Sequence, residues 1–174
     1  MAIDSTPTMP LPIVIENPGE GFDEIRSAAA TYSIYGTNVE NLVALYNIVA
    51  HDFRGNSMDN VLAGWDFNDV LRLQDGGDDT AWGNGGNDVF LFGATLTAAD
   101  AVHAGEGRDQ IAIQGNYAMT LGPSILDVES IAILNGADTR FGDPGTNSYD
   151  YDLTTLDVKS ASASPTGRRR SRRN

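Results

Sequence analysis

Between residues 55 and 91, a large apolar residue recurs about every nine positions, each time two positions after a polar residue. The clearest copy, residues 83–91, reads GNGGNDVFL and fits the pattern G-G-x-G-x-D-x-U-x, where U is a large apolar residue. Its matching residues are Gly83, Gly86, Asp88 and Phe90. Repetition at a fixed short period is typical of a solenoid, in which each repeat packs only against its neighbours.

Three less regular copies precede the clearest one, at 55–63, 64–72 and 74–82. In all of them a glycine, a polar residue and an apolar residue keep the register, although asparagine replaces the acid in the first copy and Leu73 interrupts the count before the last. The residues in register are Gly55, Asn60 and Leu62, then Gly64, Asp69 and Leu71, then Gly77, Asp79 and Ala81. Two isolated copies flank the block, at 18–26 with Asp23 and at 104–112 with Asp109.

This register predicts an all-β fold, a parallel β-roll in which each nonapeptide forms a six-residue turn and a three-residue strand. Glycines permit the positive φ angles and close backbone approaches of tight turns. Two repeats complete one coil, so successive coils stack as parallel strands about 4.8 Å apart. The apolar positions then point inward from two opposed walls. We expect this inner ladder to contain Leu62, Leu71 and Phe90, with Ala81 filling its place less well.

Stacking also predicts a chemistry for the turns. The carboxylates of alternate repeats would face a shared gap together with backbone carbonyls, which makes an all-oxygen site suited to Ca²⁺. Nitrogen or sulfur ligands for transition metals are scarce, because the chain has two histidines and no cysteine. We expect Asp69 and Asp88 to share one site and Asp79 to share a weaker one with Asn60. The turn glycines of these predicted sites are Gly64, Gly77, Gly83 and Gly86.

The isolated copies are weaker candidates, because Asp23 and Asp109 have no neighbouring repeat in the chain order with which to share a cation. The alternative interpretation is that all these acids lie in ordinary Asp-Gly and Asn-Gly turns and are simply solvated. That alternative explains the glycines, but it does not explain the register that joins each aspartate to an apolar residue two positions later.

The charge of the chain favours the interpretation that the acidic turns bind cations. The formal net charge is −13, but residues 1–157 contain all 24 acidic residues and five of the 11 basic ones, which gives −19. Such a body repels itself and nucleic acid, and bound cations would relieve the repulsion. Without cysteine there is no disulfide framework, so a bound structural metal is an alternative way to stabilise the fold. No apolar run approaches a membrane span, and residues 1–17 lack the basic start of a cleavable signal peptide.

We divide the chain into three parts. Residues 1–17 are proline-rich and read as a linker or joining strand, residues 18–157 as the roll with flanking coils, and residues 158–174 as a basic, low-complexity, disordered tail. Within the second part, residues 31–35, 111–113 and 131–134 have strand-like patterns. We expect residues 97–104 to form a short helical turn.

These residues resemble the repeats-in-toxin (RTX), or haemolysin-type calcium-binding, family. The likeness is specific for 55–91 and extends, more softly, over about 18–157, where the flanks resemble those of large bacterial RTX proteins and of serralysin-type C-terminal domains. The resemblance implies Ca²⁺ as cofactor, a type I secretion apparatus as partner, an extracellular location and folding that follows export. The tail departs from the arginine-poor export signal of that family, with five arginines in residues 168–173.

We do not expect an enzyme. The chain has no H-E-x-x-H or G-x-S-x-G motif, and His51 and His103 are isolated. The preferred hypothesis is calcium binding that couples the ion to folding of a secreted protein. The alternative is a non-catalytic C-terminal fragment of a larger secreted hydrolase, toxin or adhesin. A calcium-independent solenoid, in which the acids serve solubility, is a third possibility.

Overall fold

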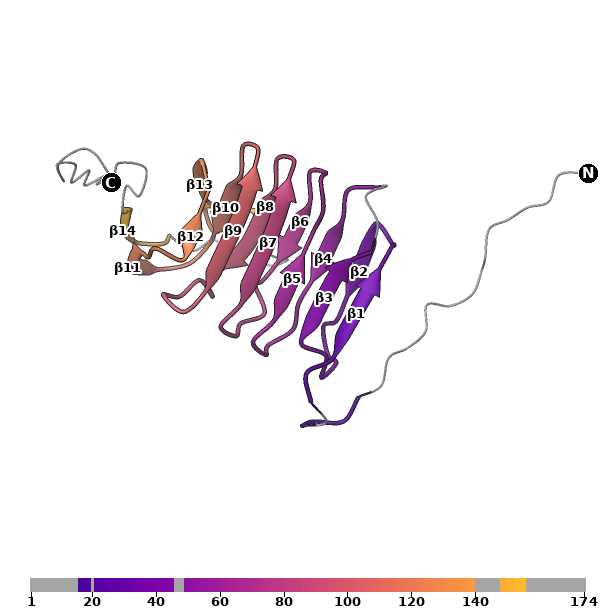
Figure 1. Ribbon diagram of the computed structural model, residues 1–174. Coiled ribbons are helices and arrows are strands. Elements are labelled where there is room, and N and C mark those ends of the chain that lie inside the picture. Colours follow the sequence, from indigo (N-terminus) through magenta and orange to yellow (C-terminus); the bar gives the residue numbers. More distant parts are fainter. Residues whose placement is uncertain (1–15, 20, 46–48, 140–147, 156–174) are drawn as a thin grey trace, which may run out of the picture.

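The chain winds into a parallel β-solenoid, in which successive strands alternate between two sheets (Figure 1). The computed structural model describes residues 16–19, 21–45, 49–139 and 148–155, and none of these residues lies in an α-helix. Each coil places one strand in each sheet, as the nine-residue register predicts. The predicted all-β parallel β-roll is therefore confirmed. Residues 1–15 of the predicted linker at 1–17, and the whole predicted tail at 158–174, lie outside the described residues.

Each of the two sheets contains six parallel strands. Sheet A consists, in order, of β1 (Glu24–Ser27), β3 (Asn41–Ala44), β5 (Val61–Ala63), β7 (Thr80–Gly85), β9 (Ala101–Glu106) and β12 (Ile125–Leu126). Sheet B consists of β2 (Thr31–Ser33), β4 (Asp52–Arg54), β6 (Val70–Arg72), β8 (Val89–Gly93), β10 (Gln110–Ile113) and β13 (Ser130–Ile133). The flanking segments before and after the repeats therefore continue the same stack.

The core lies between the two sheets and is built from inward side chains of each strand, with two from some strands, such as Phe90 and Phe92 of β8. In sheet A, Leu62 pairs in register with Ala81, and in sheet B, Leu71 pairs with Phe90. All four side chains are fully buried, so the predicted inner ladder is confirmed. Leu73, which interrupts the count in the sequence, is also buried in this core and extends it beyond the strand.

Residues 97–104 do not form the predicted helical turn. Strand β9 begins at Ala101, and its Val102 is fully buried beside Ala81. The alternation of buried and exposed positions in β9 carries His103 to the outer face, where its ring stacks on Trp82 at 3.8 Å. Tertiary pairing with β7 therefore decides the conformation of a segment whose local composition is neutral.

A short parallel pair follows the roll at its C-terminal end. Strand β11 (Tyr117–Leu121) pairs with β14 (Tyr151–Thr155), and Tyr117 donates a hydrogen bond from its hydroxyl to the Gly93 carbonyl at 2.6 Å. This contact attaches the pair to the end of β8. Among the described residues, no helix has the length and apolar character needed to cross a membrane.

Candidate metal sites between stacked turns

A row of polar side chains runs along one edge of the roll, each placed immediately before a strand of sheet B. The backbone N–H of each member donates to the side chain of the next member. The N–H of His51 donates to Asp69 Oδ1 at 2.6 Å, that of Asp69 to Asp88 Oδ1 at 2.8 Å, and that of Asp88 to Asp109 Oδ1 at 2.8 Å. The row ends at Glu129, which accepts the N–H of Asp109 at 2.9 Å. We call this row the sheet-B ladder.

A second row, the sheet-A ladder, lies on the opposite edge before the strands of sheet A. Its members are Asp23, Glu40, Asn60, Asp79 and Asp100. Here too the hydrogen bonds join consecutive coils, since the N–H of Asn60 donates to Asp79 Oδ1 at 2.9 Å and that of Asp79 to Asp100 Oδ1 at 2.8 Å. The roll therefore carries two lines of polar groups, one along each edge, whose members are buried except for the exposed Asp23 and Glu129.

Two glycine positions explain why the chain can bring these groups so close. A Cβ atom at Gly83 would collide with Asp88 Oδ2 and with the Ala104 carbonyl oxygen, so both oxygens approach the backbone more closely than a side chain would allow. Gly86 has a φ of 113°, and a Cβ there would collide with the Phe67 carbonyl of the stacked turn. The predicted glycines Gly64 and Gly77 are required for equivalent reasons, next to Asp69 Oδ2 and the Met58 carbonyl.

Burial dominates the electrostatics of both ladders. Asp79 is 2% exposed and Asp88 is fully buried, and burial raises the pKa of each carboxyl to about 7. Burial also raises the pKa values of Asp100 and Asp109. The buried Oδ2 atoms of Asp88 and Asp109 accept no hydrogen bond from any described residue. A buried carboxylate oxygen without a donor is strongly unfavourable unless a cation or proton compensates it.

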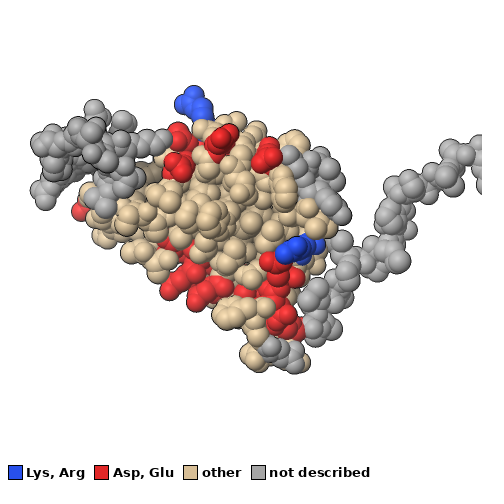
Figure 2. All heavy atoms as spheres, in the orientation of Figure 1, with Lys and Arg blue, Asp and Glu red and all other residues tan. Residues whose placement is uncertain are grey.

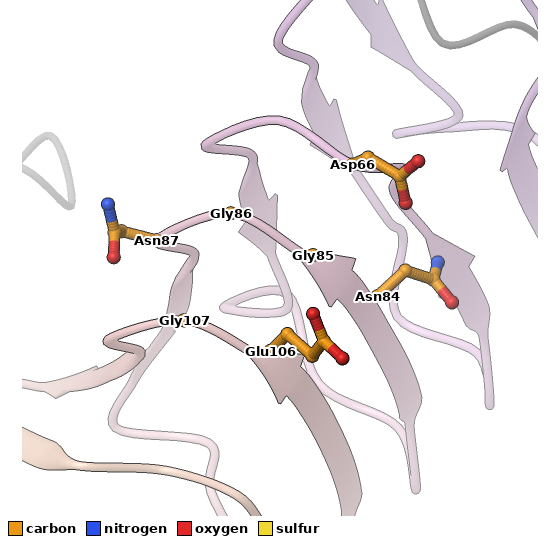
Figure 3. A pocket seen from close by; sticks show the side chains of 7 residues that line it. All are labelled: Asp66, Asn84, Gly85, Gly86, Asn87, Glu106 and Gly107. Carbon is orange, nitrogen blue, oxygen red and sulfur yellow. The ribbon is translucent and has the colours of Figure 1, made fainter.

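A solvent-open cavity of about 740 Å³ lies over the outer surface of the same sheet-B turns. Figure 3 shows the side chains of Asp66, Asn84 and Glu106 on one side of this cavity, whereas Asn87 points away. In the space-filling view, acidic side chains gather along both turn edges of the visible face (Figure 2). The turn edges are therefore acidic outside as well as inside, which increases their attraction for cations.

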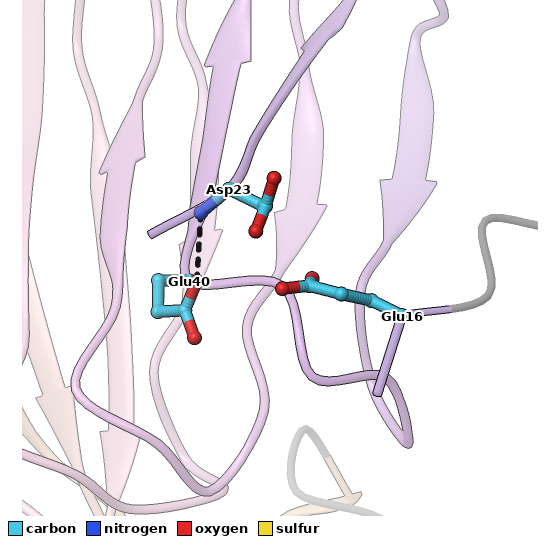
Figure 4. A group of neighbouring side chains, drawn as sticks. All are labelled: Glu16, Asp23 and Glu40. Atoms are coloured by element: carbon cyan, nitrogen blue, oxygen red, sulfur yellow. Dashed lines mark hydrogen bonds between the residues drawn. The ribbon is translucent and has the colours of Figure 1, made fainter. Parts of the chain in front are cut away.

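A third acidic group lies near the N-terminal end of the roll, where carboxylate oxygens of Glu16, Asp23 and Glu40 lie within 4.8 Å of one another. The three side chains come from different coils or loops (Figure 4), and Glu40 also accepts the backbone N–H of Asp23 at 2.9 Å. Such a group could hold a metal ion, so Asp23 belongs to an acidic cluster that sequence spacing did not reveal.

The structure brings together most of the residues that the sequence singles out. Asp69 lies next to Asp88, and Asp79 lies next to Asn60, as predicted. The expectation that Asp109 lacks a stacking partner is wrong, because residues 89–108 complete one full coil and place Asp109 directly beside Asp88.

Four ladder members were not predicted as site residues: Glu40, His51, Asp100 and Glu129. A signal for them exists in the sequence, since each precedes by two positions an apolar residue that points inward. The corresponding apolar residues are Leu42, Phe53, Val102 and Ile131. The repeat pattern used to find site residues includes glycines in the turn. The turns before these four residues contain fewer glycines or none, so the pattern does not match there.

Comparison with known proteins adds no relationship to this picture. No protein family, no curated protein and no solved structure matches the chain.

Proposed function

We propose that the roll binds Ca²⁺ between its stacked turns and that this binding completes its folding. The observation that carries the proposal is the pair of buried, donor-free oxygens, Asp88 Oδ2 and Asp109 Oδ2. They belong to neighbouring coils joined by the hydrogen bond from Asp88 N–H to Asp109 Oδ1. Two buried carboxylates in adjacent coils are unfavourable when both are ionised. A cation held between the coils would compensate their negative charge.

The surrounding atoms fit a hard cation. Beside Gly83, a carboxylate oxygen of Asp88 and the carbonyl oxygen of Ala104 both lie where a side chain would otherwise be. Oxygen ligands of mixed carboxylate and carbonyl type are those that Ca²⁺ prefers, whereas Mg²⁺ demands a stricter octahedral arrangement and dehydrates reluctantly. Among the described members of the two ladders, His51 alone has an imidazole nitrogen that could ligate a metal, and its ring Nδ1 is directed at Asp69. The donor set therefore favours Ca²⁺ over transition metals.

The raised pKa values support the same proposal. Asp79 and Asp88 hold protons up to about pH 7 because burial disfavours their charged forms. A bound cation would reverse this preference, since an opposite charge nearby favours the ionised carboxylate. The roll would then release protons when it takes up Ca²⁺, and its stability would depend on free calcium.

The biological role that this supports is a calcium-dependent folding module of a secreted protein of RTX type. Modules of this kind use calcium affinities of about 10⁻⁴–10⁻³ M, which suit extracellular concentrations. The chain would stay loosely folded where calcium is scarce and would close its turns outside the cell. A position within a larger secreted protein, with its activity elsewhere, is compatible with the same role.

The test is a calcium titration followed by far-UV circular dichroism, from chelator to about 10 mM, with magnesium as the control ion. We expect β-sheet signal to increase with calcium and not with magnesium. The double variant Asp88→Asn with Asp109→Asn should lose most of this response. A matched double variant, Asp59→Asn with Asp78→Asn, removes the same charge from outside the ladders and should keep it. A wild-type spectrum that is unchanged by calcium would contradict the proposal.

A further inference from the structure

The polar groups of the two ladders are not equally satisfied along the roll. In the middle of the sheet-A ladder, after Asp23 and Glu40, Asn60 takes the place of an acid, and its side-chain amide is hydrogen-bonded to Asn56. Asn60 Oδ1 accepts the backbone N–H of Asn56 at 2.7 Å, and Asn60 Nδ2 donates to Asn56 Oδ1 at 3.0 Å. Asn56 Nδ2 in turn donates to the Val39 carbonyl at 2.8 Å. These groups link the coils of β3 and β5 without any charge.

The sheet-B ladder has an equivalent arrangement at its first member, His51, which is 2% exposed. Asp69 Oδ1 accepts the backbone N–H of His51 at 2.6 Å, and the His51 ring places Nδ1 3.3 Å from the same oxygen. The other oxygen of Asp69 accepts the backbone N–H of Trp65 at 2.7 Å. Both oxygens of this carboxylate therefore have donors from the protein itself.

The later coils differ in this respect. Asp88 and Asp109 are as deeply buried as Asp69, but each leaves its Oδ2 atom without a donor among the described residues. Immediately before β7, the N–H of Asp79 donates to Asp100 Oδ1 at 2.8 Å, and Asp100 Oδ2 accepts the N–H of Thr97 at 2.6 Å. Along the sheet-B ladder, Asp69 before β6 therefore has protein donors on both oxygens, whereas Asp88 before β8 and Asp109 before β10 each have a buried oxygen with none. The first member, His51, is uncharged when its ring is neutral, although its buried Nε2 atom also has no partner among the described residues. Buried polar groups that lack partners disfavour folding, whereas satisfied ones do not.

We propose that the coils formed by β3, β4, β5 and β6 are a metal-independent nucleus, on which the coils from β7 to β10 fold only when a cation binds. The proposal rests on the proposed calcium function and adds an order of folding to it, with His51 before β4 and Asn60 before β5 standing where later coils have acids. Each coil then offers its strands as a template for the next, so that folding proceeds from the nucleus toward the C-terminal coils.

The first test is hydrogen exchange measured by mass spectrometry on the full chain, in chelator and in about 10 mM calcium. In chelator we expect amides in β4, β5 and β6 to be at least about tenfold more protected than those in β8 and β10. Calcium should then protect β8 and β10 and change the nucleus little. Equal exchange in both groups in chelator, followed by joint protection with calcium, would overturn the nucleus while leaving the calcium function intact.

A pair of variants with similar shape and different charge tests the role of His51 directly. His51→Asn keeps a neutral side chain that can donate to Asp69, whereas His51→Asp places a second carboxylate there. In chelator we expect His51→Asp to lower protection of β4 and β6 by about tenfold, and calcium to restore it. His51→Asn should remain within about threefold of the wild type. His103→Asp, on the outer face, is the control and should leave the exchange of the nucleus unchanged.

The outcomes separate the two proposals. Similar behaviour of His51→Asp and His51→Asn in chelator would overturn the part assigned to His51, even if calcium still protects the later coils. If calcium alters exchange nowhere in the chain, the calcium function fails and the ordered folding built on it fails as well.

Discussion

Replacing Asp88 with asparagine removes one buried charge from the centre of the sheet-B ladder while preserving the shape of the side chain. Asparagine can still accept the backbone N–H of Asp69, which now donates to Asp88 Oδ1 at 2.8 Å. Its Nδ2 group can take the place of the donor-free Oδ2, near the Ala104 carbonyl oxygen that also approaches Gly83. We therefore expect this variant to have opposite effects with and without calcium.

The magnitudes follow from the position of Asp88 between Asp69 and Asp109. In chelator near pH 8, above the pKa of about 7, the wild type carries an unpaired buried carboxylate. Removing that charge and adding a donor should raise the free energy of unfolding by about 1–2 kcal/mol. At 10 mM calcium and affinities of 10⁻⁴–10⁻³ M, each site contributes roughly 1.4–2.7 kcal/mol. Because Asp88 borders two gaps, the variant should lose roughly 3–5 kcal/mol of calcium stabilisation.

Urea unfolding followed by tryptophan fluorescence measures both effects, since Trp82 lies in β7 on the coil that contains Asp88. The control is Asp78→Asn, which removes the same charge from an exposed position and should shift neither curve by more than about 0.5 kcal/mol. The reasoning is refuted if Asp88→Asn destabilises the chelated protein and still gains the wild-type amount from calcium.

Three further outcomes are expected. In chelator, urea unfolding should show stability rising as the pH falls from about 7 toward 4, because burial raises the folded-state pKa values of Asp79 and Asp88 to about 7 and the folded chain then binds protons that the unfolded chain releases. Gly86→Ala should lower the thermal midpoint far more than Gly76→Ala, because both glycines have positive φ but only Gly86 would place its Cβ against backbone of the stacked turn. Phe90→Ala should lower the free energy of unfolding by about 3–5 kcal/mol in calcium, measured by urea titration, because its side chain is fully buried.

The nine-residue register was sufficient to predict the fold because every coil repeats the same local rule. An apolar residue two positions after a polar one gives both the inward wall and the polar edge, as at Asp69 with Leu71 and at Asp88 with Phe90. The length of the turn between such pairs is free, provided that the strands return to register. This is why Leu73 could be inserted into the core without disturbing the stack.

The same freedom explains what the sequence did not reveal. The turn that contains Asp100 has no glycine within residues 94–100, so it does not look like a repeat, although Asp100 stacks on Asp79. The role of His51 could not be predicted either, because the sequence does not show that His51 and Asp69 lie side by side in consecutive coils. Likewise, the pairing of β11 with β14 joins segments separated by about thirty residues and has no local pattern.

The ladder hydrogen bonds and the strand pairing both join each coil only to the one before it and the one after it. The roll is therefore a linear array of coils with nearest-neighbour coupling. The steepness of its calcium-dependent folding is then set by the number of consecutive coupled coils. Duplicating the coil at 74–91 should steepen the Hill slope of the calcium response, whereas cutting the coupling in mid-array should divide one transition into two. Array length would thus set how sharply the protein distinguishes one calcium concentration from another.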